Sequence, residues 1–273
     1  MLTNLWRPAL GVITAIAITT GMDANGLSAF SALPLLPLML LFWNLDLLSP
    51  REIGFVWGPL RAYALALMHA FVVLGALALA AWIAGAIHLE KTNWRHAAIN
   101  FAAVMLSTIV VAIVTEEGFF RGWLWGSLRR AGQSDGWVLA WTSVAFALWH
   151  LSAVLLDTGF NPPLAQVPLF IVNAAVMGAI WGILRLFSGS IVVSSVAHGA
   201  WNGGAYVLFG FGTKVGALGI QETATYGPEA GVLGLILNLA FAAALWQWCS
   251  RARRLATAHA AGTEDASAAM PCA

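Results

Sequence analysis

Polar residues suited to chemistry recur at regular spacing in otherwise apolar stretches of this sequence. In chain order they form three patterns, Glu116-Glu117-x-x-x-Arg121, Phe146-x-x-x-His150 and His198-x-x-x-Asn202. A spacing of four returns a side chain to nearly the same face of an α-helix. Because an ionised carboxylate is costly in hydrocarbon, glutamates inside a membrane indicate a functional site.

The first pattern assigns different roles to its two carboxylates. Glu117 and Arg121 are four residues apart and can form an ion pair along one helix face. Glu116 points ~100° away from Glu117, so it has no such partner in its own helix. A free carboxylate in a partly desolvated cavity suits general acid/base work. We therefore expect a structural ion pair, Glu117–Arg121, and a catalytic Glu116.

The three patterns also lie at overlapping depths. Counted from the cytoplasmic helix ends at ~1.5 Å per residue, Glu116 and His150 each lie ~20 Å deep. On the same rise, His198 and Asn202 lie ~12 and ~18 Å deep. In a shared cavity Glu116 can accept a proton from water held by His150. His198 and Asn202 can stabilise an oxyanion, or all four can hold a divalent metal such as zinc.

The composition is that of a multi-pass membrane protein. Of the 273 residues, 60% are hydrophobic and 9% charged, against about 25% charged in soluble domains. A span needs roughly 20 apolar residues. The sequence predicts an all-α bundle of about eight spans, at about 8–22, 28–48, 62–87, 98–120, 137–156, 164–187, 190–210 and 230–249. The absence of a basic patch with interleaved aromatic residues argues against a nucleic-acid partner. The expected partners are membrane lipids.

The sequence predicts one domain and its orientation. We expect a transmembrane bundle over 1–254, with its motif core at about 98–210, and a disordered cytoplasmic tail over 255–273. Nine basic residues fall on the side of the N-terminus (Arg7, Arg51, Arg61, Arg129, Arg130, Arg185, Arg251, Arg253 and Arg254) and three on the other (Lys91, Arg95 and Lys214). The positive-inside rule then places both termini in the cytoplasm. The short loops are typical of a bacterial inner-membrane protein.

Hydrolysis of a peptide bond inside the membrane is a reaction that suits this residue set, and other protease chemistries fit the sequence less well. A serine mechanism would need Ser190, Ser194 or Ser195 beside a histidine of another helix, and no Gly-x-Ser-x-Gly is present. An aspartyl mechanism needs two embedded aspartates, and only Asp46 comes close. The zinc-peptidase pattern His-Glu-x-x-His is absent. We expect the remaining embedded histidine, His69, to form a hydrogen bond between helices.

Taken together, the three ordered patterns resemble the CAAX prenyl protease and bacteriocin-processing family, also called the Abi family. The resemblance covers about 116–202 and implies an intramembrane endopeptidase with a cavity facing the cytoplasm and the lipid. It implies that Glu116 and His150 activate water. It further implies that His198 and Asn202 stabilise the transition state.

The function expected from this resemblance is hydrolysis of peptide bonds in membrane-associated or lipidated peptides or proteins. These substrates would reach the cavity from the cytoplasmic side or from the lipid. Two other functions remain open: a non-enzymatic immunity or scaffold protein that retains the fold, and a transporter of small solutes or ions. The lack of inverted repeats counts against the transporter.

Overall fold

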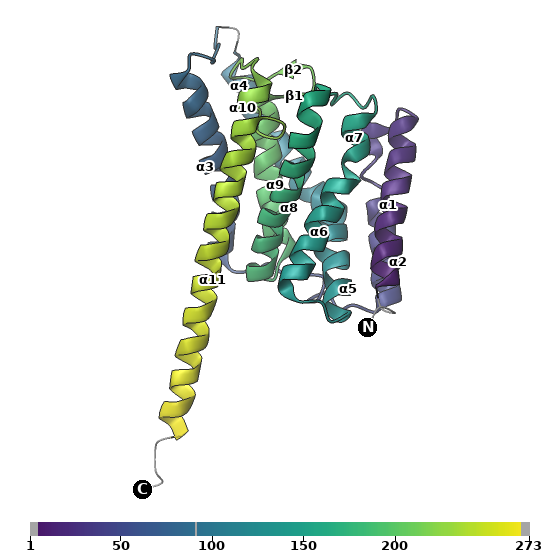
Figure 1. Ribbon diagram of the computed structural model, residues 1–273, viewed down its shortest axis with the longest axis vertical. Coiled ribbons are helices and arrows are strands. Elements are labelled where there is room, and N and C mark those ends of the chain that lie inside the picture. Colours follow the sequence, from purple (N-terminus) through teal and green to yellow (C-terminus); the bar gives the residue numbers. More distant parts are fainter. Residues whose placement is uncertain (1–4, 91, 269–273) are drawn as a thin grey trace.

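The structure is a computed structural model that describes residues 5–90 and 92–268, with the side chains of the last helix described through Arg253. Within these ranges the chain is a helical bundle with one short hairpin (Figure 1). Its first part comprises α1 (Trp6–Ala24), η2 (Ser28–Phe30), α2 (Leu35–Asp46), α3 (Leu60–Ile83), α4 (Trp94–Val114), the π-helix η3 (Glu117–Leu124) and α5 (Trp125–Arg130). The rest comprises α6 (Asp135–Trp149), α7 (Leu151–Leu155), η4 (Leu164–Gln166), α8 (Val167–Ser188), α9 (Ile191–Gly204), the π-helix η5 (Ala205–Phe209), β1 (Gly210–Phe211), β2 (Lys214–Val215), α10 (Thr223–Tyr226) and α11 (Val232–Ala268).

The predicted all-α polytopic fold is confirmed. In the described part of the chain, six helical segments are long and apolar enough to cross a membrane: Ser28–Asp46, Leu60–Ile83, Trp94–Arg130, Asp135–Leu155, Leu164–Ser188 and Val232–Arg253. Two further predicted spans, α1 and α9, are helices of the same bundle that do not meet these criteria. Both carry polar side chains that line an internal cavity, which lowers their mean hydropathy.

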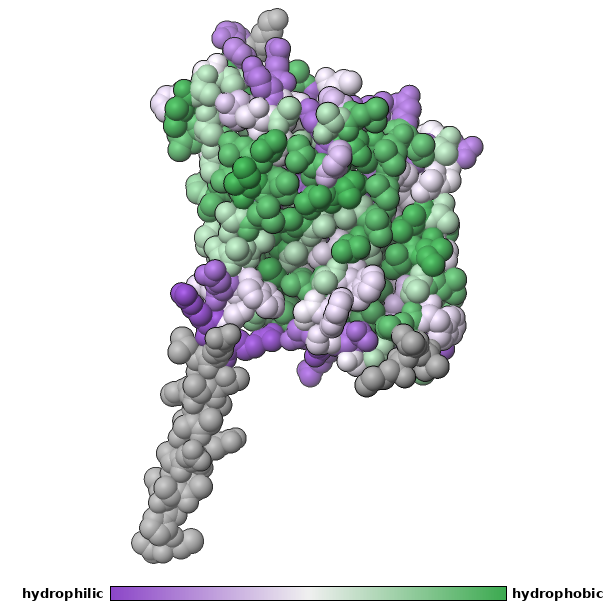
Figure 2. All heavy atoms as spheres, viewed as in Figure 1, coloured by the Kyte–Doolittle hydropathy of each residue, from purple (hydrophilic) through white to green (hydrophobic). Residues whose placement is uncertain are grey.

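The outer surface matches a protein surrounded by lipid. Apolar residues form a broad band across the face seen in Figure 2, and hydrophilic residues gather at the two ends of the bundle. Large apolar side chains such as Phe71, Trp82 and Val110 are more than half exposed. Because soluble monomers rarely expose contiguous apolar patches of this kind, the chain is an integral membrane protein.

Helix α9 packs closely against α4, and small residues make that approach possible. A Cβ atom on Gly199 would lie 2.6 Å from the backbone oxygen of Met105 and 2.5 Å from a side-chain carbon of Ile109. Glycine therefore lets the two backbones come into near contact. This packing brings the end of α4, where the two glutamates lie, beside the histidine of α9.

The helix that carries the glutamates is interrupted where they occur. Thr115 has φ −115° and ψ −100°, which ends α4, and the chain continues as the π-helix η3. A Cβ atom on Gly118 would lie 2.5 Å from the carbonyl oxygen of Ile113, so this break requires a glycine. π-Helical turns are uncommon and occur frequently at functional sites.

The last helix is longer than the sequence predicted. α11 continues to Ala268 and extends past the end of the bundle (Figure 1), whereas we expected a disordered tail over 255–273. The segment after Arg254 is rich in alanine, the residue with the highest helix propensity, which accounts for the difference. Residues 269–273 lie outside the described part of the chain.

Candidate active site

The three sequence patterns meet at one cavity. Glu116 lies at the junction of α4 and η3, and its Oε2 atom is 4.0 Å from Nε2 of His150 and 3.9 Å from Nε2 of His198. Their side chains are 17%, 20% and 5% exposed, respectively, so the site is screened but open. The cavity has a volume of about 430 Å³, and Asn202 lines it as well.

His150 is held by the backbone of its own helix. It follows α6 directly, and its Nδ1 atom lies 2.8 Å from the carbonyl oxygen of Phe146. Because a carbonyl oxygen only accepts, Nδ1 carries the hydrogen of this bond. In the neutral ring, Nε2 then presents a lone pair toward Glu116. The Phe146-x-x-x-His150 pattern thus fixes which nitrogen faces the cavity.

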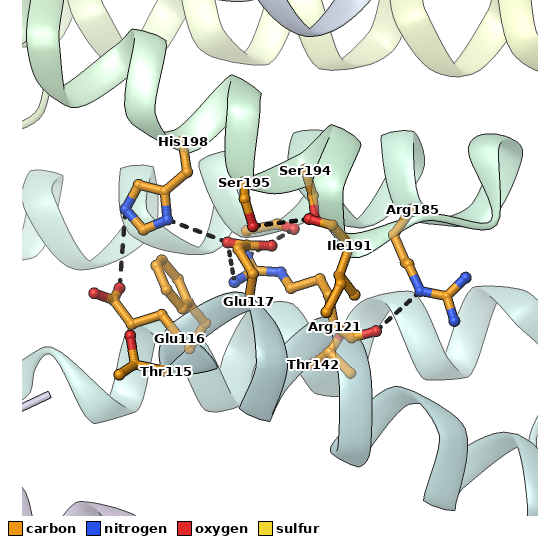
Figure 3. A network of polar contacts seen from close by, with 12 residues as sticks. Thr115, Glu116, Glu117, Arg121, Thr142, Arg185, Ile191, Ser194, Ser195 and His198 are labelled. Carbon is orange, nitrogen blue, oxygen red and sulfur yellow. Dashed lines mark hydrogen bonds and ion pairs between the residues drawn. The ribbon is translucent and has the colours of Figure 1, made fainter. Parts of the chain in front are cut away.

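The second glutamate organises a fully buried group behind the first (Figure 3). Arg121 Nη1 lies 3.2 Å from Glu117 Oε1, and neither side chain is exposed. The same carboxylate oxygen lies 3.2 Å from Nδ1 of His198. Glu117 therefore accepts hydrogen bonds from Arg121 and His198, and it orients the His198 ring so that Nε2 faces Glu116.

Aromatic rings enclose this group. The Arg121 guanidinium lies over the ring of Phe146 at 4.2 Å, and its Nη2 donates to the Gly178 carbonyl at 3.1 Å. Trp181 stacks on His198 with ring centroids 4.1 Å apart and an interplanar angle of 17°. A cation over an aromatic face is stabilised by the ring's quadrupole, most strongly where water is excluded. The rings thus fix the orientation of both charged and titratable groups.

Asn202 and its neighbours complete the wall of the cavity. Asn202 is half-buried, lies one helical turn after His198 on α9 and borders the same cavity. Glu229, which precedes α11, lines this cavity as well and accepts a hydrogen bond from Trp201 Nε1 at 3.1 Å. Asn173 donates to the carbonyl oxygens of Pro228 and Glu229, which ties this loop into the bundle.

The serines considered above do not meet a histidine in the described structure. The hydroxyls of Ser194 and Ser195 donate to the Ile191 carbonyl oxygen at 3.0 and 2.8 Å. Ser190 accepts hydrogen bonds from the first backbone N–H groups of α9, as an N-cap does. These hydroxyls serve the helix that carries them. Nucleophilic attack by serine has no geometric support here.

The donor atoms do not form a metal site as they stand. Ligands ~2.0–2.1 Å from a tetrahedral zinc ion are roughly 3.3–3.4 Å apart, which is less than the distances from Glu116 Oε2 to the two imidazoles. Among the described residues, no group of three or more His, Cys, Asp or Glu side chains is arranged to hold a metal ion. The protein side chains themselves are therefore the candidates for activating water.

Several participants could not be identified from the sequence. The bond between Glu117 and His198 depends on a π-helical turn, which the apolar pattern does not reveal. Glu229 and Asp23 line the cavity but stand outside the three patterns; their only signal is an acidic residue beside the end of a predicted span. His69, by contrast, bonds Asn238 of α11 through Nε2 at 2.9 Å, the interhelical hydrogen bond that we expected.

Comparison with known families bears directly on this arrangement. Residues 98–204 match the family model described as type II CAAX prenyl endopeptidase, Rce1-like. The match runs from α4 to the end of α9 and contains all seven residues of the three patterns. Residues 98–204 thus resemble the Rce1-like family. The resemblance drawn from the patterns is thereby confirmed.

The match to the Rce1-like family model supports a membrane endopeptidase at the level of the family. Comparisons with curated proteins and with solved structures give no match. Asp23 and Glu229 lie outside the Rce1-like segment, although both line its cavity. The walls of the cavity are thus built partly from sequence that the family model does not cover.

Proposed function

We propose that the protein is an intramembrane endopeptidase that hydrolyses peptide bonds of membrane-associated or lipidated substrates with water activated by Glu116 and His150. The observation that carries this proposal is the convergence of Glu116 Oε2 with the Nε2 atoms of His150 and His198, at 4.0 and 3.9 Å, in one cavity. The family match supports peptide-bond hydrolysis as the reaction.

The spacing of Glu116 and His150 suits one bound water. An oxygen atom at a hydrogen-bonding distance of about 2.8 Å from each of two acceptors 4.0 Å apart subtends an angle of about 90°. This is close to the angle between the two hydrogens of water. Because Glu116 and neutral His150 both present lone pairs, each accepts one hydrogen. The oxygen lone pairs then point away from both residues, toward a substrate carbonyl.

The opposite wall can receive the developing negative charge. His198 gives its Nδ1 hydrogen to Glu117, so a protonated His198 presents Nε2–H to the cavity. Asn202, one turn further on, can add an amide N–H. Donors aimed at a forming oxyanion in a site with little water act strongly because the dielectric is low. We assign this role to His198 and Asn202.

Glu116 also closes the proton cycle. As general base it takes one proton from the attacking water, and as general acid it returns this proton to the amine that leaves when the C–N bond breaks. The buried Arg121 compensates the charge of Glu117, so Glu117 remains an acceptor for His198 throughout the cycle. Glu117 and Arg121 therefore act as positioning residues.

The route of the substrate follows from the distribution of charge. Arg7 and Arg130 both donate to backbone carbonyls at the C-terminal end of α2. Asp23 borders the cavity from the opposite end of α1, ~24 Å away along the helix. With the protein in a bacterial inner membrane and both termini in the cytoplasm, the end of α1 that carries Asp23 lies on the outer side of the membrane. Of the two expected routes, we therefore propose entry from the lipid.

The proposal is tested by reconstituting the purified protein in liposomes with a library of prenylated and palmitoylated peptides. Mass spectrometry of the products is expected to show internal cleavage by the wild-type protein and none by Glu116→Gln. Fragments formed equally by both proteins would contradict the proposal. The prenylated and palmitoylated arms of the library separate the two kinds of lipidated substrate.

A further inference from the structure

The cavity holds a second buried carboxylate for which the described structure provides no counter-charge. Asp23 is 4% exposed, lines the same cavity as Glu116 and has an Oδ2 atom without a hydrogen-bond partner. The hydroxyl of Ser28, on the same wall, is likewise buried without a partner. Unpaired polar groups of this kind are costly, and a buried charge most of all.

The position of Asp23 in its helix adds to the negative potential. It lies in the last turn of α1, which contains no basic residue. The C-terminus of a helix carries the negative end of the helix dipole, so an acidic side chain there is unfavourable and a cation is favourable. The Asp23 carboxylate thus lies where a positive group is favoured.

The surroundings of Asp23 supply no such group. Asp23 takes part in none of the ion pairs between described residues. Among the residues that the structure describes, no lysine or arginine lines the cavity, and its acidic residues and histidines are Asp23, Glu116, Glu229, His150 and His198, with Tyr206 beside them. Three carboxylates from three separate segments face two imidazoles. A positive group must come from the ligand.

Asp23 is also within reach of the catalytic residues. Thr19, one turn earlier on α1 and ~6 Å away along the helix, accepts a hydrogen bond from Trp149 Nε1 at 2.8 Å. Trp149 directly precedes His150. This contact joins the wall that carries Asp23 to the helix that carries the water-binding histidine. A peptide bound at Glu116 can therefore place a neighbouring group beside Asp23.

We propose that Asp23 and Ser28 form a binding subsite for a positively charged group of the substrate, an ammonium or a guanidinium. The substrates would then be peptides with a basic side chain, or a free amino terminus, close to the bond that is cleaved. This inference rests on the proposed endopeptidase function and specifies its substrate class. It makes Asp23 a specificity-determining residue.

Binding can be measured apart from cleavage in the Glu116→Gln background. The probes are fluorescent, palmitoylated hexapeptides of alanine and leucine whose amino termini are acetylated. Each probe carries one lysine, placed at a different position in each peptide, and binding is measured to the protein in nanodiscs of neutral lipid. A matching set carries glutamine in place of lysine, and a lysine-free set carries a free amino terminus. A charge-assisted hydrogen bond to a buried carboxylate predicts about ten- to a hundredfold tighter binding of a cationic probe. Comparing the lysine and free-amine sets identifies the source of the charge.

Two further variants isolate the contribution of Asp23. Asp23→Asn is expected to abolish the preference, whereas Asp157→Asn, an exposed change outside the cavity at the same end of the bundle, should leave it intact. Equal binding of cationic and glutamine probes at every position would overturn the proposal, and so would a preference that survives Asp23→Asn. Thermal unfolding of Asp23→Asn supplies a second readout. An unpaired carboxylate predicts an unchanged or higher melting temperature, and a clear fall would show that Asp23 serves the fold.

The two proposals can fail separately. Cleavage by the wild-type protein without any preference for cationic probes would remove the subsite and leave the endopeptidase. A preference for cationic probes that depends on Asp23, without cleavage of any peptide, would retain the binding site and remove the endopeptidase.

Discussion

Removing the Arg121 guanidinium is expected to destabilise this protein far more than removing an arginine at the surface. In Arg121→Met, the Glu117 carboxylate would stay fully buried without its cation. Breaking a buried ion pair in this way costs ~3–5 kcal/mol. The Gly178 carbonyl would also lose its donor, at a further cost of about 1 kcal/mol. The summed loss of ~4–6 kcal/mol is a large fraction of the ~5–15 kcal/mol by which folded proteins are typically stable.

The measurement is reversible unfolding in mixed micelles, followed by circular dichroism during titration with a denaturing detergent. Arg129→Met is the matched control, because the pair of Arg129 with Asp135 is 49% and 32% exposed. Exposed pairs of this kind contribute ~0–1 kcal/mol. A loss of stability in Arg121→Met no larger than that in Arg129→Met would refute the reasoning.

A double variant separates charge from packing. Glu117→Gln combined with Arg121→Met removes both charges, so most of the lost stability should return. The amide oxygen that replaces the Glu117 carboxylate can still accept the Nδ1–H of His198. Cleavage should therefore be measurable in the double variant. A double variant no more stable than Arg121→Met would show that the arginine acts through packing with Phe146 and not through its charge.

Three other outcomes are expected. Gly199→Ala should lower the free energy of unfolding by ~1–3 kcal/mol, because the added methyl group overpacks against Met105 and Ile109. The control Gly75→Ala has nothing within 4 Å of its added Cβ and should not destabilise the protein. Equal effects of the two changes in the same unfolding assay would show that close α4–α9 packing is unimportant. Cleavage should survive treatment with a strong chelator, and activity that disappears and returns with added zinc would contradict the spacing argument. A cysteine placed at Asn25 should react with a membrane-impermeant maleimide added outside intact cells; reaction only after lysis would reverse the proposed orientation.

Much of the fold could be predicted because apolar runs long enough to span a bilayer are evident in any sequence. The pairing of Glu117 with Arg121 also followed from spacing, and the structure places these two side chains 3.2 Å apart. The patterns that contain His150 and His198 were expected at overlapping depths, and both imidazoles lie about 4 Å from Glu116.

What could not be predicted depends on local backbone geometry and on loops. The break at Thr115 and the π-helix after it change the direction of each side chain, which is why the bond between Glu117 and His198 was not foreseen. Asp23 and Glu229 reach the cavity from the ends of predicted spans. An apolar pattern does not show whether such residues face lipid, water or the interior.

The central claim is that Glu116 activates the water. Its most direct test is the cleavage rate of Glu116→Gln in liposomes, on a peptide that the wild-type protein cleaves, with Glu222→Gln as an exposed control. Loss of a general base predicts a rate lower by a factor of ~10²–10⁴. The variant should show an unchanged melting temperature, and Glu222→Gln should retain full activity. Full activity in a folded Glu116→Gln variant would contradict the account.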